Sequence, residues 1–276
     1  MNALTDDSWL LERTRIGVKF KPVDWFTFYA QGQDTREFGA DRPNTIGQMG
    51  AEGDDTFDLR QGWLQFGADK GLSLKIGRQI LLYGDERLIG PLDWANQSRT
   101  FDAAKLRYAA DTWSLDLFTS SVVRFEDEAF NKSDWIDSDA TRDQFFSGLY
   151  FSTTAVPAHT LDAYALQLHE SYAAGDTDFV TLGARVLADP KKLDGWEYDA
   201  EAAVQFGDVR GKDLTAFAGH VGGGYNWLES GWKPRIYAEY NYATGDTNAT
   251  DGEVGTFQNL FPTNHKFYGE MDVFSW

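Results

Sequence analysis

Apolar and charged residues alternate along most of this chain. Residues 9–21 place apolar side chains on one parity and cationic side chains on the other: Ile16, Val18 and Phe20 against Arg13, Arg15, Lys19 and Lys21. Residues 195–206 show the same division with acids: Trp196, Tyr198, Ala200, Ala202, Val204 and Phe206 against Glu197, Asp199 and Glu201. Because successive side chains of a strand point to opposite faces of a sheet, each pattern predicts a β-strand with one apolar and one charged face.

Similar segments follow one another through the whole sequence, each about ten to thirteen residues long, which is enough to cross a bilayer when tilted. They cover residues 9–21, 23–34, 57–69, 72–82, 100–110, 113–123, 143–154, 160–171, 178–188, 195–206, 213–227, 233–243 and 265–276. No run approaches the roughly 18 to 20 apolar residues of a membrane-spanning helix. The sequence therefore predicts an all-β, antiparallel fold with about 12–13 strands and excludes a helical membrane protein.

The connections and the aromatic residues favour a membrane barrel. Short turns near residues 21–24, 69–71, 109–112, 155–159, 190–194 and 229–233 alternate with long polar links, among them 35–56, 83–99, 123–142 and 244–265. Apolar faces often begin or end in an aromatic residue: Trp9, Trp25, Tyr108, Trp113, Trp196 and Tyr242. Both features are typical of outer-membrane barrels. We expect an antiparallel transmembrane β-barrel of the porin type in the bacterial outer membrane. The alternative is a soluble all-β binding or structural protein whose apolar faces pack into a sandwich.

The order of the turns has a consequence for both ends of the chain. The first short turn follows the first segment, which places residue 1 on the outer side. Bacterial barrels have an even strand number and begin and end on the periplasmic side. We therefore expect residues 1–276 to form a single barrel domain that lacks terminal strands of a barrel of about 14–18 strands. The aromatic end at residues 274–276 has a second interpretation, as a signal read by the barrel assembly machinery during insertion.

Composition narrows the class of partner. The formal net charge of -18 argues against nucleic acid, because phosphate binding needs clustered Lys and Arg in excess of the acids. The absence of Cys fits an oxidising compartment, and the mean hydropathy of -0.46 is that of a water-soluble protein. Residues 1–8 contain neither the basic segment nor the apolar core of a signal peptide, as in a mature chain. The expected partners are bilayer lipids and a hydrophilic solute.

Residues 74–107 read LKIGRQILLYGDERLIGPLDWANQSRTFDAAKLR. A strand ending in Gly-Arg-Gln, a polar loop with an Asn near an aromatic residue, and a following strand that carries Arg resemble the outer-membrane alginate-export family. The matching positions are Gly77, Arg78, Gln79, Trp94, Asn96, Arg99 and Arg107. Residues 265–276 resemble a late-middle strand of the same family. The resemblance implies a barrel larger than this chain provides, with a lumen of basic residues that attract a polyanionic sugar.

The charged parity supplies the candidate lumen residues. We expect the following side chains to line the channel and contact its solute: Arg13, Arg15, Lys19, Arg78, Arg99, Lys105, Arg107, Asp116, Arg185, Glu197, Glu201, Arg235 and Glu239. One hypothesis is that the cations of the early strands form a ladder that guides anions, because guanidinium groups bind carboxylates bidentately and stay charged. The other is that they only solvate the lumen and pair with the inner acids. The acids of the late strands depart from the purely cationic lumen that the family resemblance implies.

Two details of the pattern imply backbone irregularities. Arg78 shares the parity of Leu74 and Ile76, which would expose its charge to lipid at a cost of about 2 to 4 kcal/mol. We expect a β-bulge at Gly77 to reverse its direction. Gly219 and residues 222–224 are expected to relieve crowding or to permit a bend in their strand.

No catalytic or metal site is predicted. Glu197, Asp199 and Glu201 would offer a glycosidase its carboxylate pair, but two-residue spacing on one strand is what solvated alternation produces by default. The 4 His residues have no HExxH spacing and no Cys partners, and residues 246–252 miss the spacing of a calcium loop. We predict an outer-membrane channel (porin) that passes a hydrophilic solute, either anionic or a sugar acid or polysaccharide, with no cofactor and no enzymatic activity.

Overall fold

The computed structural model describes residues 8–39, 55–126, 129–137, 142–248, 250–263 and 265–268. Within them, long strands follow one another as β1 (Leu10–Val23), β2 (Phe26–Phe38), β3 (Asp55–Phe66), β4 (Gly71–Gln79), β5 (Phe101–Ala109), β6 (Trp113–Val122), β7 (Asp143–Thr153), β8 (His159–Tyr172), β9 (Gly175–Ala188), β10 (Trp196–Val209), β11 (Lys212–Asn226) and β12 (Arg235–Ala243). The short strand β13 (Glu253–Val254) and the helical turn α1 (His265–Tyr268) follow. Strands β1 to β12 confirm the first twelve predicted segments.

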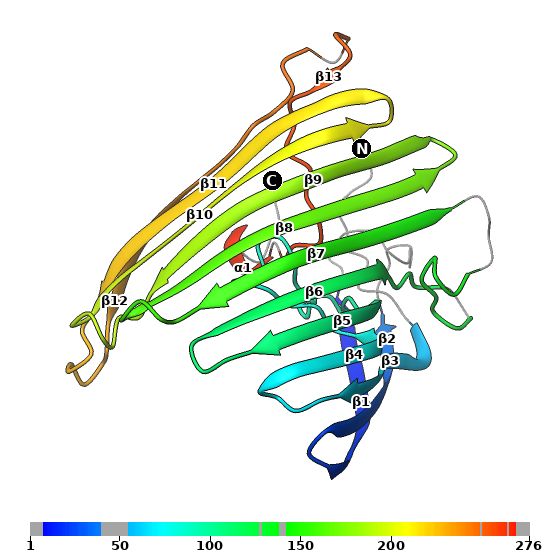
Figure 1. Cartoon of the computed structure of the whole chain (residues 1–276), viewed down its shortest axis with the longest axis horizontal. Coiled ribbons are helices and arrows are strands. Elements are labelled where there is room, and N and C mark those ends of the chain that lie inside the picture. The colour runs from blue at the N-terminus through cyan, green and yellow to red at the C-terminus, as the bar shows by residue number, and fades with distance from the viewer. Residues whose placement is uncertain are drawn as a thin grey trace.

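The strands form one sheet in sequence order, from β1 next to β2 through to β12, with every neighbouring pair antiparallel. Only β13 departs from this order, because it pairs with β11 in parallel. Figure 1 shows the sheet as a single curved layer. This meander is the arrangement of an up-and-down barrel. In the part of the chain that the structure describes, β1 and β12 are not paired with each other, so the strand number of the closed barrel stays a prediction.

Two expectations about the chain path are wrong. Residues 265–268 form a helical turn instead of a strand, while residues 269–276 of that predicted segment lie outside the described residues. The alternation of loop length also fails in the second half, because tight turns at residues 173–174 and 210–211 lie on the side of the long loops. Arg210 and Gly211 both have positive φ, of 55° and 80°. Positive φ at both central residues gives the two-residue turn that matches the twist of a sheet, so no longer loop is needed.

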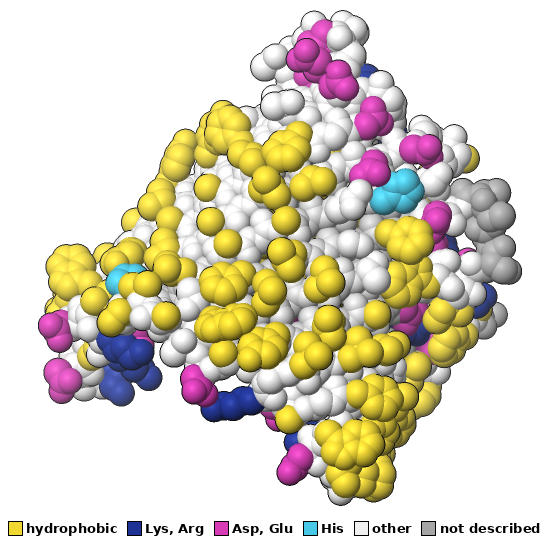
Figure 2. Space-filling view, viewed as in Figure 1, with side chains coloured by type: hydrophobic (Ala, Val, Ile, Leu, Met, Phe, Trp, Pro, Cys, Tyr) yellow, Lys and Arg dark blue, Asp and Glu magenta, His cyan; other side chains and the backbone are white. Residues whose placement is uncertain are grey.

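The apolar parity of the sheet is exposed. Ile16, Val18 and Phe20 of β1 have exposed fractions of 64%, 62% and 57%. Figure 2 shows hydrophobic side chains spread over the face of the sheet that is turned to the viewer, while charged side chains gather toward the strand ends. In a soluble sandwich these apolar side chains would be buried against a second sheet. The outer face therefore has the character of a lipid-facing surface. No helix among the described residues is long and apolar enough to cross a membrane.

Two segments fold against the inner face of the sheet. They are the β4–β5 connection, residues 80–100, and residues 255–263, and together we call them the plug. The backbone N–H of Gly90 donates to the carbonyl of Phe261 at 2.8 Å, and that of Phe261 donates to the carbonyl of Leu88 at 2.9 Å. Figure 1 shows the chain after β13 running behind the strands toward α1. The chain has left the wall here, and residues 265–268 pair with no strand of the described sheet.

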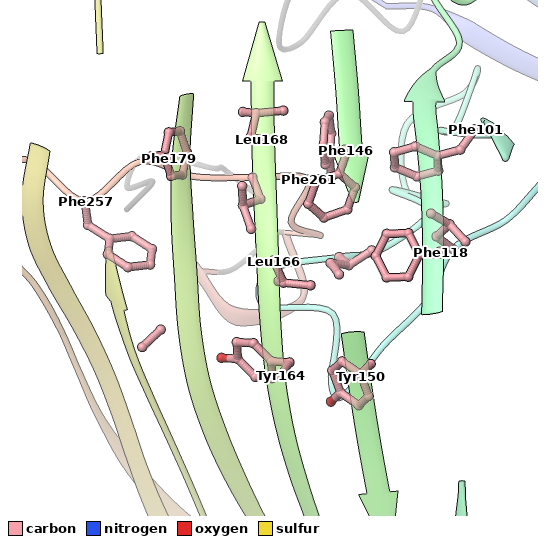
Figure 3. Packing of buried hydrophobic residues seen from close by; sticks show 14 of the residues in the cluster. Phe101, Phe118, Phe146, Tyr150, Tyr164, Leu166, Leu168, Phe179, Phe257 and Phe261 are labelled. Atoms are coloured by element: carbon pink, nitrogen blue, oxygen red, sulfur yellow. The ribbon is translucent and has the colours of Figure 1, made fainter. Parts of the chain in front are cut away.

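The plug packs on an aromatic part of the inner wall. The buried cluster includes Leu81, Ile89, Phe101, Phe118, Phe146, Leu166, Phe179, Phe257, Leu260 and Phe261. Figure 3 shows Phe261 beside Phe146, and the ring centroid of Phe261 lies 4.8 Å from that of Phe146 and 5.1 Å from that of Phe101. These wall residues lie toward the strand ends that carry the long loops, which we call the outer half of the lumen. The half toward the short turns, the inner half, keeps its polar lining.

Candidate functional site

A buried carboxylate organises the cations in the inner half of the lumen. Asp116 on β6 has a side chain only 2% exposed. Its Oδ1 accepts a hydrogen bond from Arg107 Nη1 at 2.8 Å, its Oδ2 accepts one from the Tyr83 hydroxyl at 2.9 Å, and Lys105 Nζ lies 3.5 Å from Oδ2. The sequence correctly places Lys105, Arg107 and Asp116 on the same face, and the structure brings them into direct contact. One carboxylate thus compensates part of the charge of two cations.

Lys75, Lys105 and Arg107 form a row that we call the basic strip. Lys75 on β4 and Lys105 on β5 are direct cross-strand partners, and Lys75 Nζ lies 4.3 Å from the centre of the Trp63 ring. Like charges directly opposite each other destabilise a sheet. The strip is therefore a place where the fold keeps two cations together at an energetic cost.

Two polar cavities adjoin the basic strip. One, of about 280 Å³, is lined by the strip together with Gln65, Asp69 and Ser73. The other, of about 380 Å³, shares Lys105 and Arg107 and continues across β6 to β9, where its lining includes Tyr83, Ser114, Tyr150, Ser152, Thr160, Asp162 and Arg185. Arg107 keeps 40% of its side chain exposed, so it still has donors to offer. The cavities combine cations, hydroxyl groups and aromatic rings in one tract of the inner half.

Acids of the later strands are paired. Arg185 Nη1 donates to Asp162 at 2.9 Å, Arg235 Nε to Glu197 at 2.6 Å, the Tyr164 hydroxyl to Glu201 at 2.6 Å, and Asn241 Nδ2 to Glu239 at 3.2 Å. The wall built from β8 to β12 is thus acidic but largely satisfied. The sequence places Arg185, Glu197, Glu201, Arg235 and Glu239 on the inner parity, as the contacts require. Glu197, Glu201 and Glu239 carry charge opposite to that of the basic strip, whereas Arg185 shares its sign and lines the larger of the two polar cavities with Lys105 and Arg107.

In the outer half, Arg13 and Arg15 hold the plug. Arg13 Nη1 donates to the carbonyl of Asp93 at 2.9 Å, and Arg15 Nη2 donates to the Asp93 carboxylate at 2.9 Å. Arg60 Nη2 donates to the same carboxylate at 2.9 Å. Although burial alone would raise it, the hydrogen bond from Arg15 and the charge of Arg60 hold the pKa of Asp93 below its ordinary value. Lys19 lies on β1 opposite Tyr29, nearer the short turns.

Arg78 lies in a buried ion pair. Its Nε and Nη2 donate to the Asp102 carboxylate on β5 at 3.0 and 3.2 Å, and Nη2 also donates to the carbonyl of Asn131 at 2.8 Å. The expected β-bulge is wrong, because β4 and β5 pair without a register shift from Gly71 to Gln79. Gly77 instead has a φ of 120°, and a Cβ there would lie 2.2 Å from the carbonyl oxygen of Gly62. Glycine is required for this close approach of β3.

Arg99 also binds the plug. Its Nη1 donates to the carbonyls of Gly90 at 3.1 Å and Pro262 at 3.0 Å, which joins the two segments. Burial lowers the pKa of Arg99 to about 10, so the guanidinium remains charged at neutral pH. Neither Arg78 nor Arg99 lines the two polar cavities.

Sequence reasoning missed Lys75, Arg60, Arg87 and His220 as lumen residues. The sequence pattern could have identified Lys75, because this residue lies in a predicted strand on the same polar face as Ser73. The pattern could not have identified Arg87, because it lies in a connection without any periodicity. Among the residues that the structure places, no group of three or more His, Asp or Glu side chains is arranged to hold a metal ion.

A curved antiparallel meander with an apolar outer face and a charged inner face defines a transmembrane β-barrel channel. The model of the alginate-export family matches residues 2–275, and the chain belongs to this family. The protein is therefore an outer-membrane β-barrel that lies in the lipid bilayer and passes solutes, which sets the soluble alternative aside.

The chain is also similar to solved structures of OmpT, an outer membrane protein of Vibrio cholerae. The in-vitro folded trimer form has 14% identity and a TM-score of 0.38, over 91% of this chain and 95% of that chain. A loop L8 deletion mutant has 11% identity and a TM-score of 0.37, over 88% and 96%. The outer-membrane expressed protein has 13% identity and a TM-score of 0.34, over 94% and 96%. No match was found among curated proteins.

Proposed function

We propose that this channel passes a hydrophilic, anionic solute, a sugar acid or a polysaccharide that carries carboxylates. The observation that supports the proposal best is the basic strip beside the two polar cavities. A carboxylate would bind Arg107 and the two lysines, while the hydroxyl groups of the same wall would bind those of a sugar. We further propose that the barrel assembly machinery inserts the chain.

The direct pairing of Lys75 and Lys105 supports a role in the channel more than a role in folding. Two cations facing each other across β4 and β5 disfavour the folded state. Asp116 compensates Lys105 only in part, at 3.5 Å. A negatively charged solute would relieve this repulsion while it passes.

Ion selectivity in a planar bilayer tests the proposal. With a salt gradient across the membrane, the reversal potential of the wild type should show a preference for anions. In a Lys75→Gln/Lys105→Gln variant we expect the ratio of anion to cation permeability to fall about two-fold or more, because local lumen charge sets the local ion concentration. Asp116→Asn should shift the ratio in the opposite direction, toward anions.

Lys70→Gln is the matched control, because Lys70 lies on the β3–β4 turn with its side chain 78% exposed and paired with Asp111. It should leave the selectivity unchanged. A sugar acid such as glucuronate, added to the wild type, should reduce the current, and the Lys75→Gln/Lys105→Gln variant should need a higher concentration for the same block. If the double variant keeps the anion preference of the wild type, the role of the strip is refuted.

A further inference from the structure

Arg87 attaches the plug to the acidic wall. Its Nη1 donates to Asn241 Oδ1 on β12 at 2.9 Å, and its Nη2 lies 3.2 Å from His220 Nε2 on β11 and 3.5 Å from Glu239 Oε2 on β12. The Arg87 side chain is only 4% exposed. Its guanidinium therefore joins residues 80–100 to two strands on the side of the sheet away from the Asp93 contacts.

Hydrogen bonding fixes the orientation of Asn241. Its Oδ1 accepts from Arg87, and its Nδ2 donates to Glu239 Oε1 at 3.2 Å. His220 Nδ1 lies 2.8 Å from the same Oδ1. Since Oδ1 can only accept, Nδ1 of His220 carries a proton.

His220 Nε2 has two partners that exclude each other. Asp199 Oδ2 on β10 is an acceptor and needs Nε2 to carry a proton, whereas Arg87 Nη2 is a donor and needs Nε2 to be free of one. A neutral imidazole therefore accepts from Arg87 and holds the plug. An imidazolium donates to Asp199 and places a second positive charge beside the Arg87 guanidinium.

The charged groups around His220 also make its protonation weaken the binding of Arg87. Asp199 and Glu201 approach from β10, Glu239 and the Tyr237 hydroxyl from β12, Tyr164 from β8 and Arg185 from β9, while Asp85 and Arg87 belong to the plug. The carboxylates give this wall the negative charge that attracts Arg87. A proton on His220 partly cancels that charge and weakens the attraction.

We propose that Arg87, His220 and Asn241 form a proton-sensitive latch that keeps the plug on the β11–β12 wall at neutral pH and releases it in acid. The inference rests on the proposed channel function and adds its regulation. Asp93 holds the opposite side of the plug and stays ionised in mild acid because its pKa is low. Release thus frees one side of the plug and widens the passage.

Single-channel recording between pH 7.5 and pH 5 tests the latch on the full chain. The open probability of the wild type should rise about ten-fold as the pH falls, a change within the usual range for coupling between two sites. Arg87→Gln should give the open behaviour at both pH values. His220→Gln should abolish the rise, because Gln does not titrate in this range.

His169→Gln is the matched control, since His169 is a partly exposed histidine on β8 that pairs with Asp178. It should keep the pH response of the wild type. Heat-modifiable migration in SDS establishes that each variant is folded. A wild-type channel that is anion-selective but independent of pH overturns the latch, as does a pH response that survives His220→Gln in a folded variant. A folded wild type that forms no channel at any pH refutes the proposed function itself.

Discussion

Arg78 has the strand parity of Leu72, Leu74 and Ile76, yet it lies in the interior. Its side chain and that of Asp102 are 2% and 10% exposed. The guanidinium also donates to the carbonyls of Leu59 on β3 and of Asn131 in the β6–β7 connection. Parity alone assigned this charge to the lipid, and the expected correction was a bulge. The structure instead provides a carboxylate on the neighbouring strand and a covering loop, two partners that are distant in sequence and that no periodicity reveals.

We predict that breaking this ion pair from one side destabilises the barrel strongly. Arg78→Ala leaves Asp102 buried without its cation, which costs about 3–5 kcal/mol for a buried pair. Denaturant unfolding in detergent micelles, followed by tryptophan fluorescence, measures the loss. The double variant Arg78→Leu/Asp102→Leu removes both charges and should lose less than Arg78→Ala. Equal stability of wild type and Arg78→Ala would contradict the role assigned to the pair.

At the scale of single elements, β11 explains why glycines cluster in one strand. Gly224 faces the backbone of β12, where an added Cβ would lie 2.2 Å from the carbonyl oxygen of Ile236 and 2.9 Å from the Cα of Tyr237. A Cβ at Gly223 would meet only the carbonyl oxygen of Glu197 at 3.7 Å, an ordinary contact. The sequence expectation of relieved crowding therefore holds at Gly224 but not at its neighbour.

The adjacent pair offers a controlled experiment. Gly224→Ala should force β11 and β12 apart and lower the free energy of unfolding by about 1–3 kcal/mol. Gly223→Ala should be neutral or stabilise by up to about 1 kcal/mol, because it restricts the unfolded chain without strain in the fold. Thermal unfolding followed by circular dichroism compares them. A Gly223→Ala variant as unstable as Gly224→Ala would show that β11 needs glycine for a reason other than space.

Strands could be predicted from this sequence and the plug could not, for one physical reason. A strand between lipid and water must alternate apolar and polar residues, so the sequence pattern predicts β1, β5 and β10. Residues 80–100 and 255–263 lie inside the curved sheet, between its wall and the lumen, so they have no regular alternation. Their apolar residues, such as Leu81 and Phe261, pack on wall residues that only the folded sheet brings close to them. The same limit explains the site. Lys105 and Arg107 follow from parity, whereas Arg87 depends on the plug.

For the whole molecule, one sheet has to satisfy two environments. Its outer face exposes side chains such as Leu117 and Ile236, at 55% and 66%. Each strand from β2 to β11 is paired with a neighbouring strand on both sides. Lipid cannot supply hydrogen bonds to a peptide group, so such ladders resist separation in a membrane or a micelle. SDS at room temperature should therefore fail to unfold the protein, whereas boiling should unfold it.

Electrophoresis of unboiled and boiled samples measures this resistance, and the unboiled protein should migrate at a different apparent mass. The same sample should partition into the detergent phase when a detergent solution separates, because the outer face buries apolar area in the micelle. A water-soluble sandwich would unfold in SDS without heat and remain in the aqueous phase. Identical migration before and after boiling, together with partitioning into the aqueous phase, would therefore contradict a lipid-facing outer wall. The exposed apolar side chains would then have to be covered by a second layer of protein.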